Sequence, residues 1–332
     1  MKRLFSGMQP TGAPHIGNYL GAIEKWVELQ EEYESIFCIV DLHSMTIDYD
    51  VSVMNQRIMD MATVLLASGL RAPEQCTLFV QSQVPEHALL SWLFSTVTPL
   101  GELYRMTQFK AKAQEHKKNI NSGLLTYPIL QAADIALYKG EVVPVGEDQV
   151  QHVELSRIIV RKFNNRFGEV FPEPVEKVSP AKRIMGLDGQ AKMSKSLNNY
   201  VEVLEEPEAI WGKLKTAMTD PARRTRKDAG NPDVCNIHSL HGFFSTAEQI
   251  SWVRQGCCTA GIGCFECKKV LADNMAARFA PIRERAAELR GRPGFVAEVL
   301  AHGADRCRRI AAETMKEAYE AAGLSPGRLY GE

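Results

Sequence analysis

Pro10-Thr11-Gly12-Ala13-Pro14-His15-Ile16-Gly17-Asn18 is the stretch of this sequence that decides the fold. A short apolar segment, residues 4–7, precedes it, and apolar residues recur at helical spacing after it, as in Leu20, Ile23 and Trp26. This order predicts a strand, a turn and the start of a helix. Backbone N–H groups at a helix start lack partners within the helix, so they suit a phosphate ligand. An ordinary strand-to-helix turn is the competing interpretation.

The small and polar residues of this turn also fit a phosphate. Gly12 and Gly17 carry no Cβ, so a ligand can approach the backbone closely. His15 and Asn18 are three positions apart, which places them on one face of the first helical turn. Both side chains could therefore reach one anion.

A second polar stretch, Lys192-Met193-Ser194-Lys195-Ser196, follows the glycine-bearing segment 185–189. Its two lysines can act as mobile point charges for a triphosphate whose leaving part gains charge. On its own, such a run is more often a solvated loop.

The two stretches together resemble the signature motifs of class I aminoacyl-tRNA synthetases. Gly7-Met8-Gln9-Pro10 and Gly146-Glu147-Asp148-Gln149 extend the resemblance to the bacterial tryptophanyl-tRNA synthetases, over essentially the whole chain. The resemblance implies activation of L-tryptophan by ATP to tryptophanyl-adenylate, then transfer to the 3′ end of tRNA(Trp). A tyrosyl-tRNA synthetase and a non-catalytic iron–sulfur or RNA-binding protein remain the alternatives.

The resemblance also implies which residues bind ATP and stabilise charge during adenylation. His15, Asn18, Lys192 and Lys195 are the expected catalytic residues, because phosphoryl-type transfer depends mainly on positioning and charge stabilisation. Mg²⁺ is expected with ATP, held mainly by the phosphates and water. The expected ATP contacts are Gln9, Pro10, Thr11, Gly17, Asn18, Lys112, Gly146, Glu147, Asp148, Ile184, Lys192, Met193, Ser194, Lys195 and Ser196.

Asp134, inside an apolar helical run, is the residue expected to select tryptophan. The indole N–H only donates, so a pocket carboxylate can accept from it, whereas phenylalanine would leave that acceptor unpaired. From its neighbours alone, Asp134 could equally be a solvated helix residue. Gln131 stands where many bacterial relatives place a methionine, which predicts an additional polar contact. The other expected pocket residues are Phe5, Gly7, His43, Tyr127, Val143, Val145 and Gln149.

Four cysteines within about thirty residues predict a metal centre. Some bacterial tryptophanyl-tRNA synthetases carry a four-cysteine iron–sulfur site with similar spacing, and Cys235, Cys257, Cys264 and Cys267 are the expected ligands of a 4Fe-4S cluster here. Zinc is an alternative, because four thiolates also suit it. A third interpretation is that these cysteines bind no metal. Cys258 would restore the family's first gap but shorten the next, so Cys257 is preferred.

The expected fold is α/β, since strand and helix alternate in the first third of the chain. Residues 1–200 are expected to form a Rossmann-like parallel-sheet catalytic domain, and in the resembled family the helical insertion at about 86–140 builds part of the homodimer interface. Helical patterns dominate residues 201–332, which are expected to form an α-helical domain that binds the tRNA anticodon and carries the cysteines.

Bulk composition narrows the function classes. The formal net charge is −1, so any RNA contact must come from a local patch such as 223–227, and DNA binding is not expected. No signal peptide and no apolar run long enough for a membrane span is found, which predicts a cytoplasmic protein.

Overall fold

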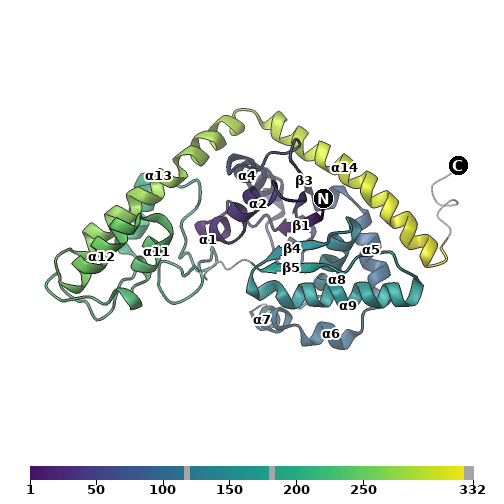
Figure 1. Ribbon diagram of the computed structural model, residues 1–332, viewed down its shortest axis with the longest axis horizontal. Coiled ribbons are helices and arrows are strands. Elements are labelled where there is room, and N and C mark those ends of the chain that lie inside the picture. Colours follow the sequence, from purple (N-terminus) through teal and green to yellow (C-terminus); the bar gives the residue numbers. More distant parts are fainter. Residues whose placement is uncertain (116–119, 179–183, 325–332) are drawn as a thin grey trace. The chain divides into compact units, whose positions relative to one another are not determined.

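The computed structural model describes residues 1–115, 120–178 and 184–324. Within these residues, all the strands belong to one parallel sheet of five strands in the order β3-β2-β1-β4-β5 (Figure 1). The parallel α/β fold expected from the sequence is confirmed. The strands are β1 (Arg3–Met8), β2 (Glu34–Ile39), β3 (Cys76–Val80), β4 (Val142–Val145) and β5 (Val175–Val178).

Helices make up most of the remaining described structure. They are α1 (Ile16–Asn18), α2 (Glu24–Leu29), α3 (Asp41–Ser44), α4 (Met54–Ala67), α5 (Glu86–Ser95), α6 (Leu100–Arg105), α7 (Thr107–Glu115), α8 (Ser122–Leu137), α9 (Val150–Phe167), α10 (Pro207–Thr216), α11 (Asn236–Phe244), α12 (Ala247–Cys258), α13 (Cys264–Arg290) and α14 (Pro293–Ala321). A π-helical segment, Tyr19–Ile23, joins α1 to α2.

The chain forms two compact units. The first unit comprises Met1–Gly12, Gly21–Pro180 and Arg292–Glu332, and the second comprises Ala13–Leu20 and Ala181–Gly291. These units differ from the expected boundary at residue 200 in three places, since Ala13–Leu20 and residues 184–200 belong to the second unit and α14 belongs to the first. The turn at Ala13–Leu20 joins the second unit through backbone hydrogen bonds, such as Ile16 N to Val201 O at 2.9 Å.

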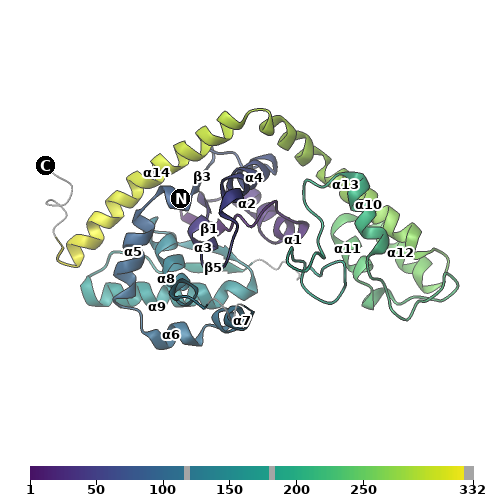
Figure 2. The same cartoon turned by 180° about the vertical axis from the view of Figure 1, so that it is seen from behind.

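The helix α14 is the third place where the units differ from the expected domains. It belongs to the first unit, where it packs on β3 and α4 (Figure 2). Gly303 makes this contact possible, because a Cβ at that position would lie 2.0 Å from the carbonyl oxygen of Leu78. Only a residue without a side chain allows the helix and the strand to approach so closely.

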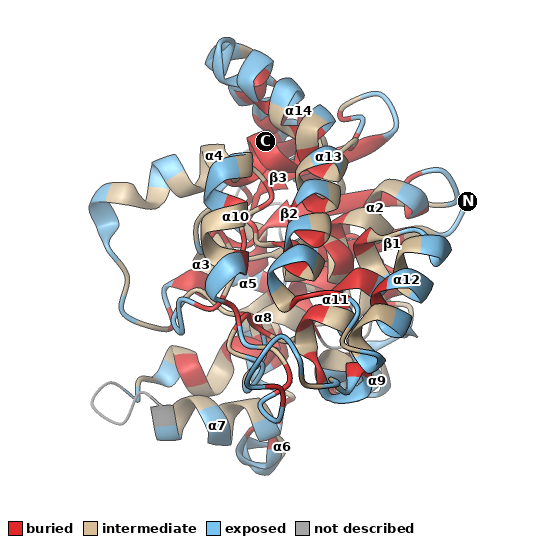
Figure 3. Cartoon of the chain, turned by 90° about the vertical axis from the view of Figure 1, so that its left-hand side faces the viewer, coloured by how far each residue is buried: buried red, intermediate tan, exposed pale blue. Residues whose placement is uncertain are grey.

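The sheet forms the centre of the first unit; β2 and β3 are its most buried strands, and β1 is buried over residues 4–6 (Figure 3). All five strands run in the same direction, so their carboxyl ends meet at one edge. The residues that follow these ends are Gln9 after β1, α3 after β2, Gln81 after β3 and Gly146 after β4. Strand order reverses between β1 and β4, the position where open α/β sheets bind ligands.

Several elements differ from those the sequence predicted. The strand β5 and the helix α11 were not anticipated, and α13 continues as one helix through Pro281. Pro128 also lies inside a helix, α8, which begins after Asn121, whose side chain accepts from Leu124 N at 2.9 Å. In the described residues, no helix has the length and apolar character that a membrane span needs.

Candidate functional site

His15 and Asn18 cap the first helix of the second unit together. His15 N donates to Asn18 Oδ1 at 3.1 Å, and Asn18 N donates to His15 Nδ1 at 3.2 Å. The pair satisfies two N–H groups that a helix start would otherwise leave free, and it fixes both side chains. The position of the His15 ring is therefore set by the backbone turn that the sequence predicts.

The environment of His15 sets its charge, and its contact with Asn18 sets which ring nitrogen carries the proton. Burial, together with the charges of Lys195 and Lys192, lowers the pKa of His15 from 6.5 to about 4. The imidazole is thus neutral at pH 7. Because Nδ1 accepts from Asn18 N–H, the single ring proton lies on Nε2, which can donate to a phosphate oxygen.

The lysine loop lies against this turn in the same unit. A Cβ added to Gly17 would lie 3.7 Å from Met193 Cβ, so the turn and the loop are in close contact. Backbone pairing holds the loop, with Met193 N donating to Ile184 O at 3.0 Å. Lys192 is exposed, Lys195 is half-buried, and Met193 and Ile184 are buried. The four expected catalytic residues therefore all belong to one compact unit.

Asn199 organises the loop, and sequence reasoning missed it. Its Oδ1 accepts from Ser194 N at 2.8 Å, and its Nδ2 donates to Asp188 Oδ2 at 2.8 Å and to Lys192 O at 3.4 Å. Gly186 makes room for the side chain, because a Cβ there would lie 2.0 Å from Asn199 Nδ2. The buried amide thus ties the backbone at two points between the two lysines.

Asp134 is buried in the first unit, not solvated. Its carboxylate accepts from Gln81 Nε2 at 2.7 Å, and it meets His87 Nδ1 at 2.6 Å and His43 Nε2 at 2.8 Å. Burial by itself raises the pKa of Asp134, but the facing rings of His87 and His43 more than offset this and hold the pKa well below its usual range. A buried carboxylate with three donors remains an acceptor.

Gln81 and His87 were not anticipated from the sequence. Gln81 directly follows β3, so its place after a strand's carboxyl end was a usable signal. His87 lies in the first turn of α5, and nothing in its local sequence distinguishes it from other helix residues.

The other expected tryptophan contacts lie in the first unit with varied exposure. Phe5 and Val143 are buried, and Phe5 stacks on Tyr138 with ring centroids 5.5 Å apart. The Tyr127 hydroxyl lies 2.8 Å from His152 Nε2, and the Lys112 ammonium lies 4.7 Å from the Tyr127 ring centre. The half-buried members are Gln131, Val145 and Gln149, and Gly7 is exposed.

The expected nucleotide contacts of the first unit follow the carboxyl ends of β1 and β4. Glu147 and Asp148 are exposed in a 3₁₀ turn, Glu147–Gln149, directly after Gly146. After β1, Gln9 is half-buried, Pro10 is buried and Thr11 is exposed. The two groups of residues follow neighbouring strands of the sheet, at the edge where such folds bind ligands.

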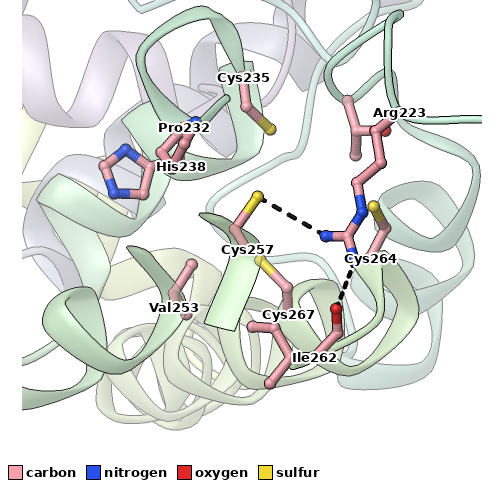
Figure 4. Close-up of a pocket in the computed structure, with 10 residues that line it drawn as sticks. Arg223, Pro232, Cys235, His238, Val253, Cys257, Ile262, Cys264 and Cys267 are labelled. Carbon is pink, nitrogen blue, oxygen red and sulfur yellow. Dashed lines mark hydrogen bonds between the residues drawn. The ribbon is translucent and has the colours of Figure 1, made fainter. Parts of the chain in front are cut away.

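Four cysteines line one pocket in the second unit: Cys235, Cys257, Cys264 and Cys267 (Figure 4). Cys258 is exposed and does not line this pocket. Burial, together with the neighbouring cysteines, raises the pKa of the Cys267 thiol to about 12. In the described part of the chain, no three His, Cys, Asp or Glu side chains are close enough to hold a single metal ion.

Arg223 points into the cysteine pocket, and so differs from the expected exposed RNA-binding run. Its guanidinium donates to Ile262 O at 2.6 Å and to Cys257 Sγ at 3.6 Å (Figure 4). Among the described residues, Arg223 Nε and His238 Nε2 are buried atoms without a hydrogen-bond partner, and both side chains line this pocket. Four thiols with a cation and unpaired nitrogen atoms fit an anionic cluster.

The comparisons with known proteins agree with this geometry. Residues 1–280 match the family described as tRNA synthetases class I (W and Y). A tryptophan–tRNA ligase of Deinococcus radiodurans is 51% identical over 98% of this chain and 99% of the relative, and one of Thermotoga maritima is 43% identical over 97% and 99%. A crystal structure of Campylobacter jejuni tryptophanyl-tRNA synthetase complexed with ADP and tryptophan matches with a TM-score of 0.86, at 34% identity over 97% of this chain and all of that one.

The parallel sheet and the family match together define a class I aminoacyl-tRNA synthetase. Within this class, the sequence identity to tryptophan–tRNA ligases over nearly the full length of the chain points to one family. The chain belongs to the family of bacterial tryptophan–tRNA ligases, as the resemblance of its motifs predicted.

Proposed function

We propose that the chain activates L-tryptophan with ATP and then transfers it to tRNA(Trp). The observation that supports this most directly is the contact between the His15 turn and the Lys192–Ser196 loop within the second unit. Both motifs are assigned to phosphate, so the residues that would bind the triphosphate belong to the second unit. The buried carboxylate of Asp134 lies in the first unit.

The proposed adenylation step is attack of the tryptophan carboxylate on the α-phosphorus of ATP, with pyrophosphate as the leaving group. His15 Nε2–H and the side chain of Asn18 hold phosphate oxygens. Lys192 and Lys195 stabilise the charge that collects on pyrophosphate as the bond breaks. Mg²⁺ bound to the triphosphate would neutralise part of the same charge.

The remaining nucleotide contacts are assigned to the carboxyl edge of the sheet. Gln9 and the Gly146–Asp148 turn would hold the ribose and neighbouring groups. Lys112 would contribute to the triphosphate, because its ammonium carries a positive charge beside Tyr127.

Tryptophan selection is assigned to Asp134, with Phe5, His43 and Val143 beside the indole. The carboxylate is ionised and accepts from the indole N–H, which phenylalanine does not offer. Gln131 adds a polar group on α8 near this pocket. The presence of tryptophan in the related Campylobacter jejuni structure supports a tryptophan pocket in this fold.

The helices α5 and α6 support the proposal of a homodimer. Large apolar side chains are exposed there, namely Leu89, Trp92, Leu100 and Tyr104. Single exposed apolar side chains are common, but a group on consecutive helices is typical of a protein interface. A cytoplasmic location and tRNA anticodon binding by the helices of the second unit complete the proposal.

We also propose a 4Fe-4S cluster on Cys235, Cys257, Cys264 and Cys267. Each thiolate of such a cluster binds a different iron, so the four sulfur atoms need not meet around one ion as zinc requires. The Arg223 Nε–H, which has no hydrogen-bond partner among the described residues, would then face the charge of the cluster. The cluster would support the helices rather than take part in adenylation.

Charging of tRNA tests the proposed function. The purified protein is incubated with ATP, Mg²⁺, labelled tryptophan and tRNA(Trp), and acid-precipitable label is measured. Tryptophan attached to the tRNA supports the proposal. Formation of the adenylate without any charging would contradict the transfer step.

A further inference from the structure

Most of the hydrogen-bond acceptor sites on the buried carboxylate of Asp134 are already occupied. A carboxylate has about four lone-pair sites. Oδ1 meets two donors, Gln81 Nε2 at 2.7 Å and His87 Nδ1 at 2.6 Å, and Oδ2 meets His43 Nε2 at 2.8 Å. Within the described residues, one site on Oδ2 is left, and an indole has one N–H.

The donor on His87 is fixed by the contact of its other ring nitrogen. The Tyr138 hydroxyl lies 2.8 Å from His87 Nε2. Because imidazole nitrogen is a good acceptor, the tyrosine O–H donates to Nε2. His87 must then carry its proton on Nδ1, where it faces Asp134.

Gln81 is also held in one orientation. Its Oε1 accepts from Leu42 N at 3.1 Å, which turns the NH₂ group toward Asp134. Gln81 directly follows β3, and His87 lies in α5. The oxygen Oδ1 is therefore held by side chains from two different elements.

We propose that Gln81 and His87 are positioning residues for tryptophan selection: they occupy Oδ1 and leave Asp134 a single acceptor site, on Oδ2, for a substrate with one N–H donor. This inference rests on the proposed role of Asp134 in binding the indole. Neither residue needs to touch tryptophan. Both act through the orientation and the ionised state of the carboxylate.

The test compares tryptophan with β-(3-benzothienyl)alanine, a near-isostere in which sulfur replaces the indole N–H. The measured quantity is the kcat/KM for tryptophan divided by the kcat/KM for the analogue, both in ATP–pyrophosphate exchange. A role in folding alone would lower both values together, whereas a role in reading the N–H lowers only the tryptophan value. The variants are Gln81→Met, His87→Phe and Tyr138→Phe, with Tyr33→Phe as a matched control.

We expect Gln81→Met and His87→Phe each to lower the ratio by about tenfold, the effect of one well-placed hydrogen bond. Tyr138→Phe should lower it by less, because His87 keeps its contact with Asp134. Tyr33 precedes β2 at the opposite edge of the sheet, and its hydroxyl contacts Lys177, so Tyr33→Phe should leave the ratio unchanged. If His87→Phe fails to fold, Gln81→Met gives the same test.

The outcomes separate this inference from the proposed role of Asp134. A wild-type protein that does not discriminate between the two substrates would contradict both. If Asp134→Asn abolishes discrimination while Gln81→Met and His87→Phe retain it, Asp134 reads the indole without these residues and the inference is wrong.

Discussion

His15 and Asn18 hold each other through reciprocal hydrogen bonds, from His15 N to Asn18 Oδ1 at 3.1 Å and from Asn18 N to His15 Nδ1 at 3.2 Å. This contact leaves Nε2 as the only ring nitrogen of His15 that can bind a ligand. It also fixes the His15 ring, which the proposed function assigns to a phosphate oxygen, by the geometry of a helix start.

The lowered pKa of His15 predicts a pH-dependent contribution to stability. The pKa is 6.5 in its ordinary state and about 4 in the folded protein, so the unfolded chain binds the proton more readily. The contribution is fully present above pH 6.5 and is lost as pH falls toward 4. His15→Gln should therefore lose less free energy of unfolding between pH 7 and pH 4.5 than the wild type does.

Denaturant unfolding at both pH values measures this difference. The exposed His302 provides the matched control, and His302→Gln should follow the wild type. If His15→Gln and the wild type lost the same free energy of unfolding between pH 7 and pH 4.5, the fold would not hold the His15 ring neutral.

Lys195→Ala should slow adenylate formation far more than it weakens tryptophan binding. Its charge acts on pyrophosphate as it separates, an interaction that is stronger in the transition state than in the ground state. Single-turnover adenylation should fall by about 10²–10³-fold, with less than about a threefold change in the Kd of tryptophan. The control is Lys139→Ala, which removes a lysine paired with Glu317 outside the loop. An unchanged single-turnover rate would remove Lys195 from the mechanism.

Asn199→Ala should slow the same step through the lysine loop. Loss of the side chain frees the backbone at Ser194 and Lys192, so we expect about a tenfold lower rate of adenylation. Combined with Lys195→Ala, the effects should be less than additive, because Asn199 acts by placing the lysine. Asn55→Ala, on the exposed face of α4, is the control. Full additivity would mean that Asn199 acts independently of Lys195.

The cysteine pocket should hold about four iron and four sulfide per chain after anaerobic purification. Cys257→Ser should lose the iron, while the neighbouring exposed Cys258→Ser should retain it, because only Cys257 lines the pocket. Iron and acid-labile sulfide analysis with a visible absorption spectrum measures this. A colourless protein with one tightly bound zinc would replace the cluster by a zinc site, and loss of metal in Cys258→Ser alone would reverse the ligand assignment.

Local patterns predicted much of the fold. The strand, turn and helix start around His15 and the parallel sheet follow from apolar spacing and short turns. The strand β5 was missed because Glu176 and Lys177 interrupt its apolar pattern, so only pairing with β4 defines it. Likewise, the single helix α13 includes a proline that normally ends a helical pattern.

The candidate site was predictable where function depends on neighbours in sequence. The motifs around His15 and Lys195 and the spacing of the cysteines are local. The partners of Asp134 are not, since Gln81 and His87 lie 53 and 47 positions away and meet it only in the folded protein. Arg223 was misread for the same reason, because its burial against Ile262 depends on another segment.

The most direct test of the central claim is ATP–pyrophosphate exchange measured with each of the twenty amino acids. In the proposed function, the residues around His15 and Lys195 bind the triphosphate during adenylation, and Asp134 accepts from the indole N–H. The account therefore predicts exchange that depends on tryptophan, with tyrosine and phenylalanine at background. Exchange with tyrosine and none with tryptophan would contradict it.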